Sequence, residues 1–132
     1  MKLTRSQVWA VFHEDRAHRM RFTVEESIDG ATFAPVDYSS ANAKVYFRAW
    51  LQPVGSQTAS DFVINAEQTK VGDGSGGKFD TKNTITSSYG EIFCALVSVD
   101  EASANAAAPS GYVEEVLKVW TSSVEPTIQP NP

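Results

Sequence analysis

The stretch from Ala43 to Leu51 constrains the fold most, because it divides its side chains cleanly between two faces. In an extended backbone, one face carries Val45, Phe47, Ala49 and Leu51, and the other carries Lys44, Tyr46, Arg48 and Trp50. Pro53 and Gly55 end the pattern, since neither residue favours a strand interior. The stretch predicts a strand that needs other strands to cover it.

A second alternating stretch, from Arg19 to Glu25, precedes it and places Met20, Phe22 and Val24 on one face. Asp29-Gly30 follows as a turn signal, because glycine supplies the positive φ of tight turns. Pro35 has no N–H for a ladder, so residues 33–37 are expected to be a connection or an edge.

Other stretches add further strands. Residues 7–12 and 61–71 alternate, with Phe62, Ile64 and Ala66 expected on one face, and residues 90–99 are apolar on both faces, as in a central strand. Residues 111–121 read as the last strand, with a β-bulge near Glu114-Glu115. Residues 1–6 are interpreted as a polar lead-in and the Ala-rich residues 100–110 as a long loop.

About seven strands and no amphipathic helix predict an all-β protein with one antiparallel β-sandwich. The 132 residues suit a single domain. We place the sandwich at residues 1–123 and an extended, Pro-rich C-terminal tail, or arm, at residues 124–132. An ordered Pro-rich end needs a surface to lie on, so the arm is expected to be pinned to a neighbouring subunit.

Charge and cysteine content narrow the function classes. The net charge is −5, and basic residues do not cluster beyond the loose group Arg16, Arg19 and Arg21, which argues against nucleic acid and membrane partners. The single cysteine, Cys94, cannot form an intrachain disulfide, and its apolar neighbours predict a buried thiol. Neither a signal peptide nor a membrane-spanning apolar run is expected.

Two local patterns suggest chemistry but have the wrong spacing for it. His13 and His18 flank two carboxylates, yet they are five residues apart in an expected turn, whereas zinc proteases place two histidines four apart on a helix. We interpret this cluster as solvated turn charges. No metal site is expected there.

The run Gly72-Asp73-Gly74-Ser75-Gly76-Gly77 is superficially similar to the nucleophile segment of serine proteases. An extra glycine interrupts it and a base is missing from its sequence context. Calcium binding by Asp73, Ser75 and Asp80 stays open, although the spacing of known calcium loops is absent. We interpret the run as a turn or a flexible hairpin tip and predict a non-enzymatic protein without a cofactor.

The aromatic residues leave two binding hypotheses open. Trp9, Trp50 and Trp120, together with Tyr46 and Tyr112, suit either a sugar-binding platform or a protein interface. The interface candidates come from the aromatic residues and from the arm, and they are Trp9, Tyr46, Trp50, Trp120, Pro126, Ile128 and Pro130.

The strand and turn motifs also resemble a known family. Residues 22–24, Asp29-Gly30 and residues 35–49 resemble the N-terminal domain of phage baseplate upper proteins, whose pattern is a Phe-Thr-Val-like strand, an Asp-Gly turn, Pro-Val-Asp-Leu-Thr-Gly-Ala and an alternating strand ending near Arg. Residues 76–79, 90–96, 112–120 and 124–127 follow the later strands in order. The resemblance spans about residues 8–128, with departures at Tyr38, Ser40-Ala41 and the Ala-rich stretch.

This resemblance implies an immunoglobulin-like sandwich and a building block of the virion, and it carries over no catalytic residue. We expect a bacteriophage structural protein, assembled in the host bacterial cytoplasm, that acts as an adaptor subunit of the tail, baseplate or fibre attachment. Its expected partners are other virion proteins and further copies of itself. Capsid decoration or a head-fibre role is one alternative, and a small carbohydrate-binding, host-receptor sandwich is the other.

Overall fold

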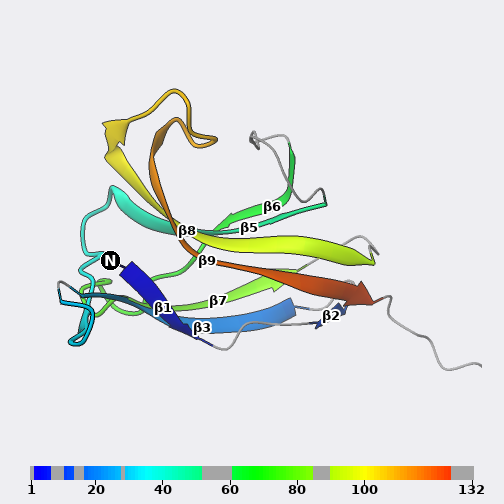
Figure 1. Ribbon diagram of the computed structural model, residues 1–132, viewed down its shortest axis with the longest axis horizontal. Coiled ribbons are helices and arrows are strands. Elements are labelled where there is room, and N and C mark those ends of the chain that lie inside the picture. The colour runs from blue at the N-terminus through cyan, green and yellow to red at the C-terminus, as the bar shows by residue number, and fades with distance from the viewer. Residues whose placement is uncertain are drawn as a thin grey trace, which may run out of the picture.

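The computed structural model describes residues 2–6, 11–13, 17–27, 29–51, 61–84 and 90–125, which form two packed β-sheets (Figure 1). The strands described are β1 (Lys2–Ser6), β2 (Val11–His13), β3 (Ala17–Glu26), β4 (Ala34–Pro35), β5 (Ala43–Trp50), β6 (Phe62–Glu67), β7 (Lys78–Thr84), β8 (Glu91–Ala104) and β9 (Tyr112–Glu125). Seven of them have five or more residues, and β2 and β4 are shorter. The predicted all-β sandwich of about seven strands is confirmed.

The larger sheet has five strands in the order β2-β9-β8-β5-β6. Its pairs are antiparallel except β2 and β9, which run parallel. β8 lies at the centre, as its apolar sequence predicts, and buries side chains on both faces. We call the face toward the other sheet the inner face and the opposite one the outer face.

The smaller sheet is built around β3. β1 pairs with one edge of β3, and β7 and β4 share the other edge. The predicted alternation is confirmed, because Met20, Phe22 and Val24 are all buried. Residues 1–6 were predicted to be a polar lead-in, which is wrong for Lys2–Ser6, because these residues pair with the edge of β3. Backbone N–H and C=O groups form this ladder, so a polar segment can pair there as well as an apolar one.

The core lies between the two inner faces and is rich in aromatic contacts. Phe22 and Phe79 stack at 5.0 Å between ring centroids, and Tyr38 meets Phe79 edge-on at 5.3 Å. Phe47 and Trp120 stack at 5.9 Å within the larger sheet. Such pairs add about 0.5–1.5 kcal/mol beyond the burial of their area.

Polar groups also link the two layers. The Tyr38 hydroxyl lies 3.0 Å from the Ser98 hydroxyl on β8, which ties the crossover after β4 to the larger sheet. Gln68, Thr81 and Asn83 are buried and bond to one another where the chain passes from β6 to β7. Because each of these groups has a partner, the interior tolerates them.

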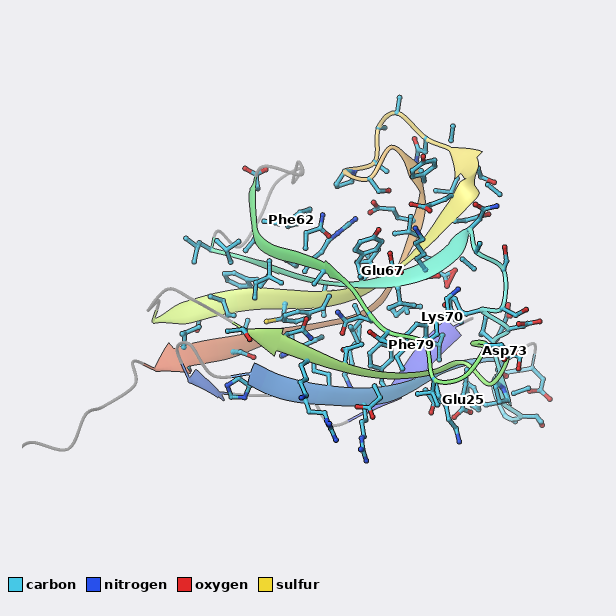
Figure 2. All side chains as sticks on the ribbon, turned by 180° about the vertical axis from the view of Figure 1, so that it is seen from behind. Glu25, Phe62, Glu67, Lys70, Asp73 and Phe79 are labelled. Carbon is cyan, nitrogen blue, oxygen red and sulfur yellow. The ribbon has the colours of Figure 1, made fainter. Side chains whose placement is uncertain are left out.

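The glycine-rich run was predicted to be a turn or a flexible hairpin tip, and the structure has a compact turn there. Figure 2 shows Lys70, Asp73 and Phe79 around this turn, where Lys70 bridges to Phe79. Gly74 and Gly77 are buried against the backbone of β3 and of the segment that follows β4. The Gly74 carbonyl accepts from the Tyr38 N–H at 2.9 Å, and the Gly77 carbonyl accepts from Val24 at 2.8 Å. Glycine serves here for close backbone approach.

Two further predictions need correction. The Ala-rich stretch is not a long loop: β8 continues to Ala104, and a turn over residues 105–111 joins it to β9. Phe62 does not share a face with Ile64, because the pairing shifts between Ala49 and Trp50, so that Ala49 faces Ile64 and Trp50 faces Phe62. The one-residue shift turns Phe62 to the outer face.

Cys94 is buried in the core, as predicted, and its thiol should resist modification. Burial raises the pKa of Cys94 to about 12, and a hydrogen bond with Ser122 opposes this only in part. At pH 8 the thiolate fraction is then about a thousandfold below that of an ordinary cysteine. We expect iodoacetamide to label the native protein at least about a hundredfold more slowly than the urea-unfolded protein. Equal rates in mass spectrometry would contradict a closed core at β8.

Candidate functional site

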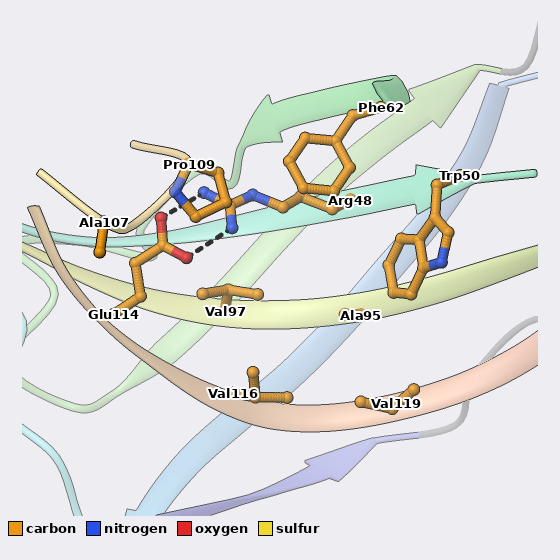
Figure 3. Close-up of a pocket in the computed structure, with 10 residues that line it drawn as sticks. All are labelled: Arg48, Trp50, Phe62, Ala95, Val97, Ala107, Pro109, Glu114, Val116 and Val119. Carbon is orange, nitrogen blue, oxygen red and sulfur yellow. Dashed lines mark hydrogen bonds and ion pairs between the residues drawn. The ribbon is translucent and has the colours of Figure 1, made fainter. Parts of the chain in front are cut away.

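The outer face of the larger sheet carries an apolar groove of about 390 Å³ (Figure 3). We call it the outer groove. Its lining comes from β5, β6, β8 and β9 and from the turn between the last two, and consists of Arg48, Trp50, Phe62, Ala95, Val97, Ala107, Pro109, Glu114, Val116 and Val119. The β8–β9 hairpin rises above the sheet beside it (Figure 1).

The groove is apolar because β8 presents hydrophobic side chains on its outer face as well as on its inner face. Ala95 and Val97 form the floor, between Trp50 and Phe62 of the neighbouring strands on one side and β9 on the other. Trp50 packs edge-on against Phe62 at 6.0 Å. The floor and the aromatic wall are therefore rigid, since their side chains are held by one another.

A β-bulge in β9 completes the opposite wall. Leu96 pairs with Lys118 and Val97 pairs with Val116, so Leu117 is the extra residue. The sequence predicted a bulge near Glu114-Glu115, and the structure has it slightly later. The bulge lets Leu117 pack on the inner core while both Val116 and Val119 stand on the outer face.

Val116 and Val119 are 58% and 59% exposed, although each borders an apolar groove. A branched apolar side chain that stays in water on a sheet face gives up about 1.5–3 kcal/mol of burial free energy. Contiguous exposed apolar surface next to a groove is typical of a protein or ligand interface. This wall is therefore the part of the site that another molecule would cover.

A buried ion pair closes one end of the groove. Arg48, which is 3% exposed, donates to both carboxylate oxygens of Glu114, at 2.7 and 2.8 Å. Its Nε donates to Asn65 at 3.1 Å, and its guanidinium lies 4.9 Å from the Phe62 ring centroid. The Ser110 N–H also donates to Glu114, at 3.0 Å.

The surroundings of Glu114 keep it ionised. Burial alone would raise the pKa of this carboxyl, but the hydrogen bonds from Arg48 and Ser110 and the charge of Arg48 outweigh burial and lower it. The pair thus exposes no net charge to the groove. What remains for recognition is shape and apolar surface, and we find no nucleophile or proton-transfer set among the residues that line it.

The structure separates the aromatic interface candidates. Tyr46 and Trp50 lie on the outer face, and Trp50 lines the groove, but Trp120 packs on the inner core against Phe47. Trp50 is only 9% exposed and also stacks on Phe93, so it offers little ring surface to a sugar. Trp9, Pro126, Ile128 and Pro130 lie outside the described residues.

Sequence reasoning missed most of the groove, namely Phe62, Val97, Val116, Val119 and the Arg48–Glu114 pair. The apolar character of β8 on both faces was a usable signal, since a two-sided strand at a sandwich surface requires a cover on each side. The slip in the β9 alternation was a second signal. The pairing of Arg48 with Glu114, 66 residues away in the chain, left no local trace.

The other candidate sites do not assemble in the described part of the chain. Asp73 accepts from the Ser75 backbone at 2.9 Å and its hydroxyl at 2.7 Å, which is a local turn, while Asp80 lies beside Arg19 and Arg21. Glu14 and Asp15 of the His13–His18 cluster lie outside the described residues, and His18 pairs with Asn83 of β7. Among the described residues, no acidic, histidine or cysteine side chains group as metal ligands, and no helix is long and apolar enough to span a membrane.

No family model, curated protein or solved structure matches this chain.

Proposed function

We propose that this protein is a non-enzymatic structural component of a bacteriophage virion, an adaptor subunit that docks neighbouring subunits of the particle, other virion proteins or further copies of itself, through its outer groove. The observation that carries the docking role is the exposed wall of Val116 and Val119 beside a rigid apolar floor. The phage context rests on the resemblance of residues 22–24, Asp29-Gly30 and 35–49 to baseplate upper proteins.

Charge supports a protein partner over the other classes. The chain is acidic, with a net charge of −5, and the groove holds its one ion pair internally. Apolar contact with a protein surface suits such a site, whereas a polyanion would require unpaired basic groups. Capsid decoration or head-fibre attachment is the alternative position in the particle, and it would use the same groove.

The double substitution Val116→Asp and Val119→Asp is expected to lower incorporation into particles at least about tenfold. Each aspartate removes apolar contact and places a charge in the interface, and a loss of about 1.4 kcal/mol is already tenfold. The measurement is mass spectrometry of purified particles of the phage that encodes the chain, with immunogold labelling to place it on tail, baseplate or capsid.

Val71→Asp is the control, because Val71 is also exposed, at 48%, but lies beside the glycine turn and not in the groove. It should be incorporated like the unaltered chain. Absence of the unaltered chain from purified particles would reject the virion role. Normal incorporation of the double variant would reject the groove as the docking surface.

A further inference from the structure

The segment after β9 has the pattern of an amphipathic extended arm. Residues 126–132 lie beyond the described part of the chain, and their sequence places Pro126, Ile128, Pro130 and Pro132 at alternate positions, with Thr127, Gln129 and Asn131 between them. Alternate side chains of an extended backbone point to opposite sides. One face of such an arm is wholly apolar and the other wholly polar, and neither carries a charged side chain. The arm was predicted to begin at Val124, which is wrong, because Val124 and Glu125 pair with β2 as the end of β9. The arm is therefore residues 126–132.

We propose that the arm of one copy lies along the outer groove of a second copy. The apolar face of the arm matches a groove walled by Trp50 and Phe62 on one side and by Val116 and Val119 on the other. Ile128 is the one side chain of that face that is not a proline. This inference rests on the proposed docking role of the groove, and it names the occupant.

Length and polarity agree with this occupant. Seven residues in a β-strand conformation, the one in which side chains alternate between two faces, span about 23 Å. Along β9, the wall extends from Val116 to Thr121, which is about 17 Å. Thr121 marks the far end of the aromatic wall, because it pairs with Phe93, which in turn pairs with Trp50. The prolines bring no N–H group that would need a partner in an apolar groove. Because Arg48 and Glu114 already pair with each other, an arm without charged side chains can cover them and leave neither charge without a partner.

The reach of the chain favours a second copy over the same one. Val119 lies six residues before Glu125, at the end of β9, which is about 20 Å along the strand. Ile128 lies three residues after Glu125 and reaches at most about 11 Å from it. Even an immediate reversal would leave Ile128 about 9 Å short of Val119 of its own chain. The arm of a neighbouring copy has no such limit.

Disulfide trapping between two full-length variants, each with one added cysteine, tests the proposal. One chain carries Val119→Cys and the other Ile128→Cys, and the native Cys94 is buried in both. Mixing them under mild oxidation is expected to yield the mixed disulfide dimer at least about tenfold faster than a mixture of Val71→Cys with Ile128→Cys. A rate no higher than that control would overturn the proposal. So would rapid formation of an intrachain disulfide in a chain that carries both Val119→Cys and Ile128→Cys, because it would show the arm folding back on its own groove.

Self-association of the full chain provides the second measurement. In sedimentation equilibrium, Ile128→Asp is expected to weaken association at least about tenfold, because it charges the apolar face of the arm. Gln129→Asp adds the same charge to the polar face and should change association less than about threefold. Equal effects of the two substitutions would overturn the register proposed for the arm.

The outcomes separate this inference from the proposed function. If the chain is found in purified particles but no mixed disulfide forms, the virion role stands and the arm is not the occupant. If the mixed disulfide forms but the chain is absent from particles, the contact between the arm of one copy and the outer groove of another is supported, and the virion role is rejected.

Discussion

Replacing Arg48 by alanine is expected to lower the free energy of unfolding by about 3–5 kcal/mol. The substitution leaves the Glu114 carboxylate at the closed end of the outer groove without its two charge-assisted hydrogen bonds. It also removes the contact with Asn65 and the guanidinium that covers the Phe62 ring. Urea unfolding followed by tryptophan fluorescence measures the change.

The double variant Arg48→Met with Glu114→Leu is the control that assigns the loss to the unpaired charge. Apolar side chains of similar length refill the space, and such replacements are often neutral or stabilising. We expect the double variant to unfold within about 1–2 kcal/mol of the unaltered protein, well above Arg48→Ala. A double variant as unstable as Arg48→Ala would mean that packing, and not charge, dominates at this site.

The Arg48–Glu114 pair also makes the free energy of unfolding depend on pH. The folded-state pKa of Glu114 is lowered below its ordinary value of 4.5, so its contribution to stability is fully present above that value. The contribution is lost as the pH falls from there through the folded-state pKa. Stability measured from pH 6 downward should therefore decrease more for the unaltered protein than for the Arg48→Met, Glu114→Leu variant.

Gly77→Ala is expected to cost about 2–5 kcal/mol, which is large for the addition of one methyl group. Gly77 has φ +68, and an added Cβ would lie 2.7 Å from the Val24 carbonyl oxygen and 2.8 Å from that of Val36. The left-handed backbone costs about 1–2 kcal/mol for an L-residue, and overpacking against backbone adds about 1–3 kcal/mol. Thermal or urea unfolding measures the total.

Two glycines of the same turn separate the two causes. Gly72 has a positive φ of +63 but open space around its Cβ position, so Gly72→Ala should cost only the backbone strain, about 1–2 kcal/mol. Gly76 has neither a positive φ nor a close neighbour, and Gly76→Ala should be nearly neutral. Equal costs at positions 72 and 77 would contradict the packing of this turn against β3 and β4.

Most of the architecture could be predicted from the periodicity of the sequence. Alternation identified β3 and β5 with their buried faces, and the two-sided apolar run identified β8 as central. The polar sequence of β1 carried no such signal, since that strand exists through backbone pairing with β3. The glycine run was predicted as a turn, but its packing was not, because glycine in a free tip and glycine at a close backbone contact look the same in one sequence.

The candidate groove was harder to predict from the sequence. The apolar floor could be predicted from the sequence of β8, but the walls depend on two register shifts. One leaves Val63 unpaired between β5 and β6, and the other leaves Leu117 unpaired between β8 and β9. Each shift moves a hydrophobic side chain to the outer face, and hydrophobicity patterns alone do not locate such shifts within two residues.

The sequence by itself determined the fold class, the buried faces of β3, β5 and β8, and the burial of Cys94, because these depend on local alternation and on the exclusion of apolar groups from water. Only the tertiary structure decided which residues meet on the outer face: it paired Arg48 with Glu114, turned Phe62 and Val119 outward and packed Gly77 against Val24 and Val36. These contacts join residues far apart in the chain, and their geometry depends on strand register. That register is set when the sheets pack, and not by any single segment.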